Sequence, residues 1–479
     1  MTWLNDLDNE IFDTDPTTYH DATHVAGEIY VVAYTRDYTD GYVTSLRITA
    51  EGVATLLDTI QYSAVNLTHK KVVVLDANVF AVFSSNVGGG YIHTLSVDLV
   101  TGALANIDNR VFDASSDELT ACHIDGTQYA IFYQGPGGDG WLRTWSIADN
   151  GVIAALETDS WEWGPVTGEG EDIYHIPGTL IYIGISFNNV FTFQIANNGI
   201  IAPFIIDTFA LTANADHPRL TPVSGTIYAF VYRDPAGASG GDLTLDTLDI
   251  DNAGNIAGAL TDTWSYFDQG HDASIMRLTF YADVFWIFHT GYTGAEHYVR
   301  GIQITIDNAG NIGALVDCGE FSTQDAFGNS SDDNGDKVTL PINGTNLIAC
   351  VWRDYDGGFQ GMLTTVGFQP TVTTQVPTRV LTEITAHGNV TVLGEPDPTH
   401  GFCYSETDTT PDIGDSLIDE GIAVGVGAFS AVIPLLVSGN TYYLRSFAYN
   451  GAIVAYGPVE TFIAQWEPIP QTLPATEVT

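Results

Sequence analysis

Aspartates recur along this chain of 479 residues, each just before a short apolar run that predicts a buried strand. Carboxylates in equivalent places could hold a hard cation such as Ca²⁺ or accept hydrogen bonds from sugar hydroxyls. Aspartate also caps its own loop by accepting backbone N–H bonds, and repetition alone places one such residue in every unit. We favour the interpretation that each aspartate caps its own loop. The candidates for binding a ligand or cation are Asp21, Asp117, Asp172, Asp216, Asp272 and Asp336.

Three arginines, each followed by an aspartate, stand at equivalent places close after a predicted strand: Arg36, Arg233 and Arg353. Because the chain has only 14 Lys and Arg residues, this repetition is not chance. A guanidinium fork binds a carboxylate through paired hydrogen bonds, which would suit a ligand. Arg–Asp pairs that brace neighbouring loops are the favoured alternative. The sequence has no H-E-x-x-H motif, and no catalytic residue is predicted.

Seven apolar runs must position these residues. The runs are rich in aromatic and β-branched side chains, and each predicts a buried strand. Six of them are followed, one strand later, by a turn with a glycine, whose positive φ suits a hairpin. The runs are 29–34, 79–83, 129–133, 180–185, 227–232, 284–288 and 347–352, and the turn glycines are Gly52, Gly102, Gly151, Gly199, Gly254 and Gly310.

An outer strand follows each turn and carries an aspartate and then an aromatic residue. Each unit therefore has four strands and about 50 residues, the period of propeller blades. The seventh unit has no such outer strand, and residues 6–13 match the missing pattern and are expected to complete it. The marker pairs are Asp58 and Tyr62, Asp108 and Phe112, Asp159 and Trp161, Asp207 and Phe209, Asp262 and Trp264, and Asp317 and Phe321.

Residues 1–370 thus resemble seven-bladed β-propellers, which implies an all-β ring closed by an N-terminal strand. The resemblance is one of repeat and topology and implies no particular activity. Closure by the N-terminal strand would also remove an unpaired sheet edge.

A second domain is expected after the 50-residue period stops. Residues 371–376 are expected to be a Thr-rich linker, and 465–479 a Pro-rich extended tail. Residues 377–464 resemble the fibronectin type III-like modules of bacterial surface and secreted proteins, on the stretches 384–386, 388–391, 400–405, 441–450 and 456–457. The resemblance implies an immunoglobulin-like or fibronectin III-like β-sandwich.

Charge narrows the possible partners. With 59 Asp and Glu against 14 Lys and Arg, the net charge of −45 argues against nucleic acid and against anionic membrane surfaces. No run of about 18 apolar residues predicts membrane insertion, and the N-terminus shows no Sec signal peptide. The four cysteines stand singly in apolar runs and are expected to be buried thiols.

These features favour a non-enzymatic structural or attachment protein of a virion or other extracellular assembly, such as a tail, fibre or decoration component. The propeller would be the binding platform, and other subunits of the particle or filament the partners. One alternative is a cell-surface glycan-binding adhesin module, and another is a propeller glycosidase or lyase. No cofactor is predicted, with Ca²⁺ as the one candidate ion. The expected location is the virion or the extracellular surface.

Overall fold

The computed structural model divides the chain into two units, Met1–Val366 and Gly367–Thr479. It describes residues 4–464 apart from internal gaps, and some strand residues, among them Asp216, Arg233 and Asp272, are described by their backbone only. The gaps are 87, 165–171, 187–188, 212–215, 235–241, 267–270, 278–283, 293–296, 323–337, 344, 346, 355–358, 369, 381–382, 395–396 and 451–453.

Antiparallel sheets make up the first unit, and its one short 3₁₀ helix in the described part is η1 (Pro136–Gly138). Five sheets have four strands each. In chain order their strands are β5 (Thr68–Asp76), β6 (Val79–Asn86), β7 (Gly89–Val97), β8 (Leu104–Asp113); β9 (Asp117–Asp125), β10 (Gln128–Gln134), β11 (Gly140–Ser146), β12 (Asp159–Gly164); β13 (Asp172–His175), β14 (Ile181–Ser186), β15 (Asn189–Gln194), β16 (Asp207–Ala210); β17 (Asp216–Ser224), β18 (Ile227–Asp234), β19 (Asp242–Asp249), β20 (Asp262–Tyr266); β21 (His271–Arg277), β22 (Val284–Tyr292), β23 (His297–Ile306) and β24 (Ile312–Ser322).

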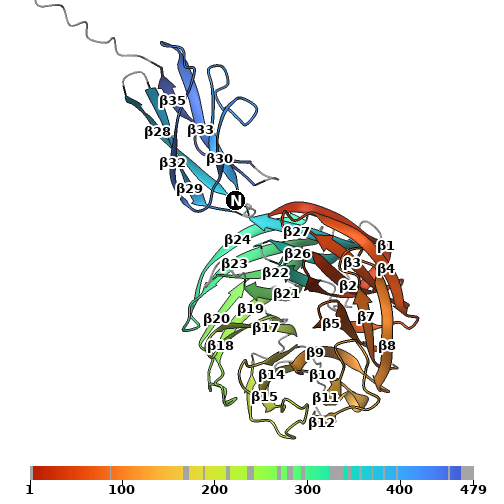
Figure 1. The fold of residues 1–479 in the computed structure, drawn as a ribbon. Coiled ribbons are helices and arrows are strands. Elements are labelled where there is room, and N and C mark those ends of the chain that lie inside the picture. The colour runs from red at the N-terminus through yellow and green to blue at the C-terminus, as the bar shows by residue number, and fades with distance from the viewer. Residues whose placement is uncertain are drawn as a thin grey trace, which may run out of the picture. The chain divides into compact units, whose positions relative to one another are not determined.

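A seven-stranded sheet joins the two ends of this unit. Its order is β25-β26-β27-β1-β2-β3-β4, so β1 has β27 on one side and β2 on the other. Residues 6–13, the expected closing strand, lie in β1. Figure 1 shows the sheets as a ring, with first strands such as β5, β9, β17 and β21 toward its centre, which is a β-propeller fold. The strands are β25 (Val338–Pro341), β26 (Ile348–Asp354), β27 (Gln360–Phe368), β1 (Leu4–Ala26), β2 (Ile29–Arg36), β3 (Asp40–Ile48) and β4 (Ala54–Ser63).

The outer-strand aspartates fasten each repeat to the next. In each, Oδ2 accepts the backbone N–H of a residue in the following repeat at 2.8–3.0 Å, while Oδ1 accepts the N–H of the next residue in its own strand. Hydrogen bonds to a charged acceptor are the stronger kind. The pairs are Asp8 and Ala54, Asp58 and Leu104, Asp108 and Ile153, Asp159 and Ile201, Asp207 and Ile256, and Asp262 and Ile312.

A second set of bonds holds the glycine turns. The six turn glycines have φ between +79° and +87°, the region in which a Cβ is strained. Each glycine carbonyl accepts a hydrogen bond from a hydroxyl of the preceding repeat at 2.5–2.7 Å. The hydroxyls belong to Ser45, Thr94, Thr144, Thr192, Thr247 and Thr365, the last of which reaches Gly52 across the closure of the ring.

The outer-strand aromatics cover glycines of the neighbouring third strand. A Cβ on Gly90 would lie 2.1 Å from the Phe112 ring, so only glycine fits beneath it. In the third repeat the covering residue is Trp163 rather than the expected Trp161. The aromatic and glycine pairs are Tyr62 and Gly41, Phe112 and Gly90, Trp163 and Gly140, and Phe12 and Gly361.

The second unit has two sheets. One has the order β28-β29-β32, and the other β31-β30-β33-β34, with β35 also paired to β33. Its core draws Ile384 and Ala431 from the first sheet and Phe402 and Leu444 from the second. The strands are β28 (Thr371–Val380), β29 (Glu383–Val392), β30 (Thr399–Ser405), β31 (Ser416–Ile422), β32 (Gly427–Val432), β33 (Thr441–Tyr449), β34 (Val454–Tyr456) and β35 (Glu460–Ile463).

The expected linker at 371–376 is wrong, because these residues form the first part of β28 and Thr371 pairs with Val392. Threonine and valine favour extended backbone, and here they find a partner strand. Among the described cysteines, Cys350 and Cys403 are buried and Cys122 is partly exposed, while Cys318 lies outside the described side chains. No helix in the described part of the chain is long and apolar enough to cross a membrane.

Candidate ligand site at the ring axis

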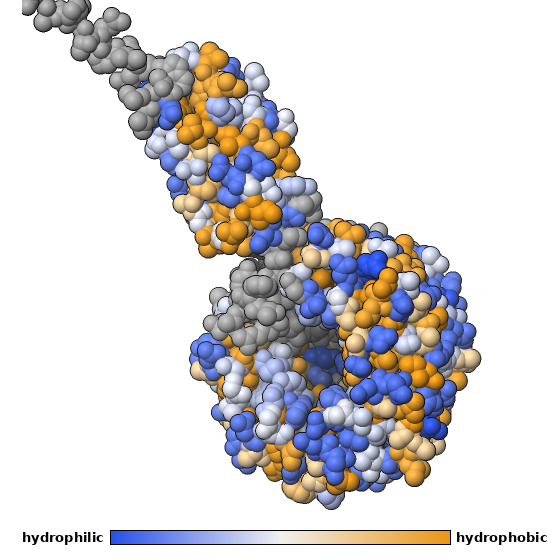
Figure 2. All heavy atoms as spheres, viewed as in Figure 1, coloured by the Kyte–Doolittle hydropathy of each residue, from blue (hydrophilic) through white to orange (hydrophobic). Residues whose placement is uncertain are grey.

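Four charged residues occupy equivalent places on four inner strands. Asp21 pairs with Ala33, Lys71 with Phe83, Asp172 with Ile185 and Arg219 with Val231, each near the middle of its repeat's second strand. We call these four, Asp21, Lys71, Asp172 and Arg219, the axial cluster. Figure 2 shows the ring hollowed near its centre, with hydrophilic surface on the visible wall.

Both aspartates of the axial cluster reach into the following repeat. Asp21 Oδ2 accepts the Val72 N–H at 2.6 Å, and Asp172 Oδ2 accepts the Leu220 N–H at 3.0 Å. In each case the residue just before the donor is the cation of the cluster. The chain therefore builds the same arrangement of aspartate, backbone N–H and cation twice, at two separate junctions of the ring.

The charges of the axial cluster act across the axis. Burial raises the pKa of both Asp21 and Asp172, and the positive charges of Lys71 and Arg219 act on each carboxyl in the opposite direction. Lys71 and Asp172 stand on strands that are two repeats apart, so they interact across the centre of the ring. Lys71 Nζ lies 3.8 Å from Asp21 Oδ2, an ion pair too long for a direct hydrogen bond.

Cys122 on β9 is near the axial cluster and does not fit the role of nucleophile. Burial raises the pKa of its thiol to about 12, and the charge of Asp172 raises it further. The thiolate is the reactive form of cysteine, and at neutral pH this group stays protonated.

Strained residues lie at β-bulges in three neighbouring inner strands. Tyr19 of β1, His69 of β5 and Glu118 of β9 have φ of +54°, +27° and +33°. His69 Nδ1 lies 3.2 Å from both Asp117 Oδ1 and the Glu118 backbone nitrogen. The hydrogen bond from His69 lowers the pKa of Asp117. Left-handed residues other than glycine cost energy and cluster at functional sites, so this rim belongs to the candidate site.

Arg36 braces the ring rather than facing a ligand. Its guanidinium bonds Asp13, which also accepts the Tyr34 hydroxyl at 2.6 Å, and it stacks 3.9 Å over the Tyr42 ring. These contacts tie β1 to β2. Arg353 is buried at 5% exposure, with its guanidinium 5.2 Å from the Phe359 ring.

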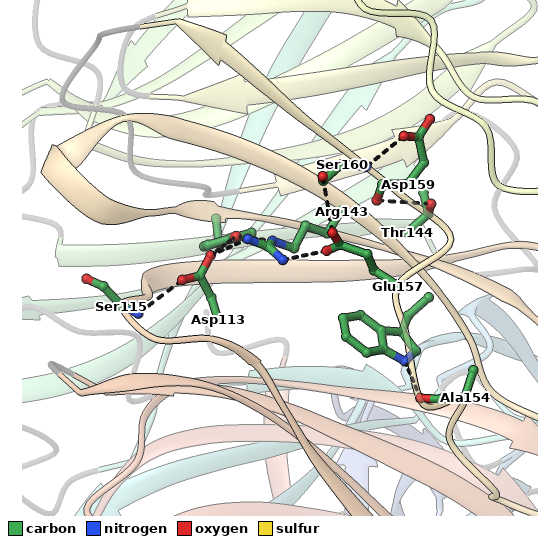
Figure 3. A network of polar contacts seen from close by, with 10 residues as sticks. Asp113, Ser115, Arg143, Thr144, Ala154, Glu157, Asp159 and Ser160 are labelled. Carbon is green, nitrogen blue, oxygen red and sulfur yellow. Dashed lines mark hydrogen bonds and ion pairs between the residues drawn. The ribbon is translucent and has the colours of Figure 1, made fainter.

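The Arg36 network has an equivalent two repeats later. Asp113 accepts the Tyr133 hydroxyl and, at 2.8 Å, the Arg143 guanidinium, which also binds Glu157 (Figure 3). Arg143 was not a candidate from the sequence, because it lies in the middle of β11 and not at the end of a second strand, where the other arginines stand. The two networks tie an outer strand to the second strand of the next repeat.

The structure places the other predicted site residues in different locations or does not describe their side chains. Asp21 and Asp172 share the axial cluster, and Asp117 lies at its rim. Among the described residues, no group of three His, Cys, Asp or Glu side chains could hold a metal ion, so Ca²⁺ stays a prediction. The residues whose side chains lie outside the description are Asp216, Asp272, Asp336 and Arg233.

Sequence reasoning missed the two cations of the axial cluster. Lys71 belongs to Lys70-Lys71, the one adjacent pair among the 14 cations of the chain, and that rarity was a usable signal. Lys70 itself is buried at 8% exposure and donates to the Leu67 carbonyl at 2.7 Å. Arg219 has no such signal, because only the ring brings it opposite Lys71.

Comparison with known proteins finds no matching family model and no matching curated protein. Solved structures do match. A periplasmic gluconolactonase of Pseudomonas aeruginosa is 14% identical, with a TM-score of 0.47, over 73% of this chain and 96% of that one. A putative 6-phosphogluconolactonase of Bacteroides uniformis is 15% identical, with a TM-score of 0.44, over 71% and 94%. The Cps50 β-propeller domain of Myceliophteria thermophila is 11% identical, with a TM-score of 0.42, over 74% and 99%. At these identities the likeness concerns architecture, and the activities named belong to those proteins.

Proposed function

We propose that this chain is a non-enzymatic attachment protein of an extracellular assembly such as a virion, with the propeller as its binding platform. The ring would have seven blades, because β1 serves as the outer strand beside β27 and as the inner strand beside β2. When β1 is counted in both places, the seven-stranded sheet divides into two blades of four strands each, β25-β26-β27-β1 and β1-β2-β3-β4. Other subunits of the particle would be the partners, and the extracellular surface the location.

The second unit supports an attachment role. We propose that it is a fibronectin type III-like sandwich, and its strand order, β28-β29-β32 against β31-β30-β33 with β34 and β35, supports this proposal. Such modules space and connect domains, and this one follows directly from the last strand of the ring. We propose that it links the propeller to neighbouring subunits.

The observation that carries the platform role is the use of the aspartates. Six of them fasten repeat to repeat through pairs of backbone hydrogen bonds, and the axial aspartates do the same at the centre. Sites built on rigid elements hold a ligand in a fixed geometry, and this frame is fastened at both its rim and its axis.

Light scattering tests the assembly role. The mass of the full chain in solution is compared with that of a chain ending at Ala464, with and without millimolar Ca²⁺. We expect a multimer that falls to a monomer on truncation. A monomer under every condition would contradict the assembly role and favour the second candidate function, a glycan-binding adhesin.

A glycan-binding adhesin is the second candidate, favoured by the polar axial cluster and its rim of Tyr19, His69 and Asp117. A glycan array on the intact monomer would test it. Turnover of an array glycan would instead favour the glycosidase or lyase alternative.

A further inference from the structure

The placement of two cations in the axial cluster is unusual for this chain. With a net charge of −45 it has 14 Lys and Arg residues, and two of them, Lys71 and Arg219, stand at equivalent inner-strand positions and both act on the Asp172 carboxyl. The overall field of such a protein repels anions from its surface. A pair of cations at the axis is therefore a local exception to the charge of the molecule.

In the pair Asp21 and Lys71, the more exposed charge is the positive one. Asp21 is only 7% exposed, and its Oδ2 is engaged by the Val72 N–H, whereas the Lys71 side chain is 42% exposed. At 3.8 Å from Asp21, the Lys71 ammonium keeps donors for a further acceptor. A ligand entering along the axis would meet this ammonium before it met the carboxylates.

The backbone holds both carboxylates in place. Asp21 Oδ2 accepts the Val72 N–H and Asp172 Oδ2 accepts the Leu220 N–H, and each bond fixes its carboxylate at a junction between repeats. The four formal charges sum to zero, which suits a ligand with one negative charge better than a dianion. Hydroxyl groups of the same ligand could donate to the flanking carboxylates and to Thr120, which pairs with Phe132 in the same register.

We infer that the axial cluster binds the carboxylate of a small hydroxylated acid between Lys71 and Arg219, with Asp21 and Asp172 accepting its hydroxyls. The inference rests on the proposed role of the ring as a binding platform but not on assembly into a particle. The ligand has two possible sources, a free sugar acid or the uronic acid end of a polysaccharide, and their shared chemistry is what the site recognises.

Calorimetry and ligand-detected NMR on the full chain test this inference at pH 7 and low salt, where charge interactions are least screened. The probes are glucuronate, neutral glucose and an oligosaccharide with a terminal glucuronate. We expect glucuronate to bind and glucose not to bind. Tighter binding of the oligosaccharide would identify the polysaccharide source, and equal binding the free acid.

Variants separate recognition from folding. Lys71→Gln and Arg219→Gln should each weaken glucuronate binding by about tenfold or more, the usual worth of a charge-assisted hydrogen bond. Arg47→Gln is the matched control: it removes the same charge from an exposed arginine that bonds the Val100 carbonyl, and it should leave binding unchanged.

Equal binding of glucose and glucuronate would overturn the inference, as would full affinity in a Lys71→Gln variant with an unchanged melting temperature. Binding that requires Ca²⁺ would also overturn it, because the carboxylates would then be the ligating groups. A chain that is monomeric but binds glucuronate would contradict only the assembly role.

Discussion

His93 on β7 should make the ring sensitive to acid. Its side chain is 8% exposed and packs between the rings of Tyr62, at 4.9 Å, and Tyr91, at 6.1 Å. Burial lowers the pKa of His93 to about 4 from the ordinary 6.5. The unfolded chain therefore binds a proton at a higher pH than the folded one, and the stability that neutral His93 allows is lost as pH falls from 6.5 toward 4.

The magnitude follows from the shift. At about 1.4 kcal/mol per pH unit, folding loses about 2 kcal/mol by pH 5 and about 3 kcal/mol by pH 4 from this group alone. His93→Phe keeps an aromatic ring in place and removes the titration. The difference in unfolding free energy between His93→Phe and the wild type should therefore grow in favour of the variant by these amounts.

Urea unfolding followed by tryptophan fluorescence, at each half unit of pH from 8 to 4, measures the difference. Carboxylates titrate equally in both chains, so their contribution cancels. Ile92→Val is the control, since it changes the neighbouring core without changing a titrating group, and its curve should run parallel to that of the wild type. If His93→Phe also ran parallel, the histidine would be hydrated in the folded ring and the reasoning would be refuted.

Three further predictions concern the frame. Asp108→Ala should lower the free energy of unfolding, measured with urea, by about 2 kcal/mol, because it leaves two backbone N–H groups without their acceptor. The control Asp149→Ala makes the same charge change at an exposed site and should lower it by almost nothing, and equal losses would refute the fastening role. Gly90→Ala should lower stability by about 1–3 kcal/mol through its clash with the Phe112 ring, and Phe112→Leu in that background should recover part of the loss. The melting temperature should rise between 0.1 and 1 M NaCl, because salt screens the charge of −45; a flat response would contradict this.

The repeat could be predicted from the sequence because local chemistry marks it. Apolar runs alternate with turn residues along the chain, and this alternation predicts the strands. The six turn glycines adopt the positive φ that their turns need. The outer-strand aspartates were visible too, but their function was not. Each accepts an N–H from a residue more than 40 positions away, as Asp108 does from Ile153, and no local pattern encodes that partner.

The site was only half predictable for the same reason. Asp21 and Asp172 stand out as acids before strands, which is a local feature. Lys71 has the rare adjacent pair Lys70-Lys71 as a signal, whereas Arg219 is an ordinary strand residue until the ring brings its charge to bear on Asp21 and Asp172. The error at 371–376 has a different cause, because a Thr-rich stretch suits both a linker and a strand, and only the pairing partner decides between them.

The double role of β1 has a mechanical consequence. The second unit continues the chain from β27, so tension applied to it enters the ring through that strand, whose hydrogen-bonded neighbours are β26 and β1. A pull along β27 loads these ladders in parallel, and their bonds must break together rather than one by one. The joint that completes the ring is thus also the joint that bears the load. Trimming the N-terminal strand would weaken the molecule under tension well before it changed any ligand contact.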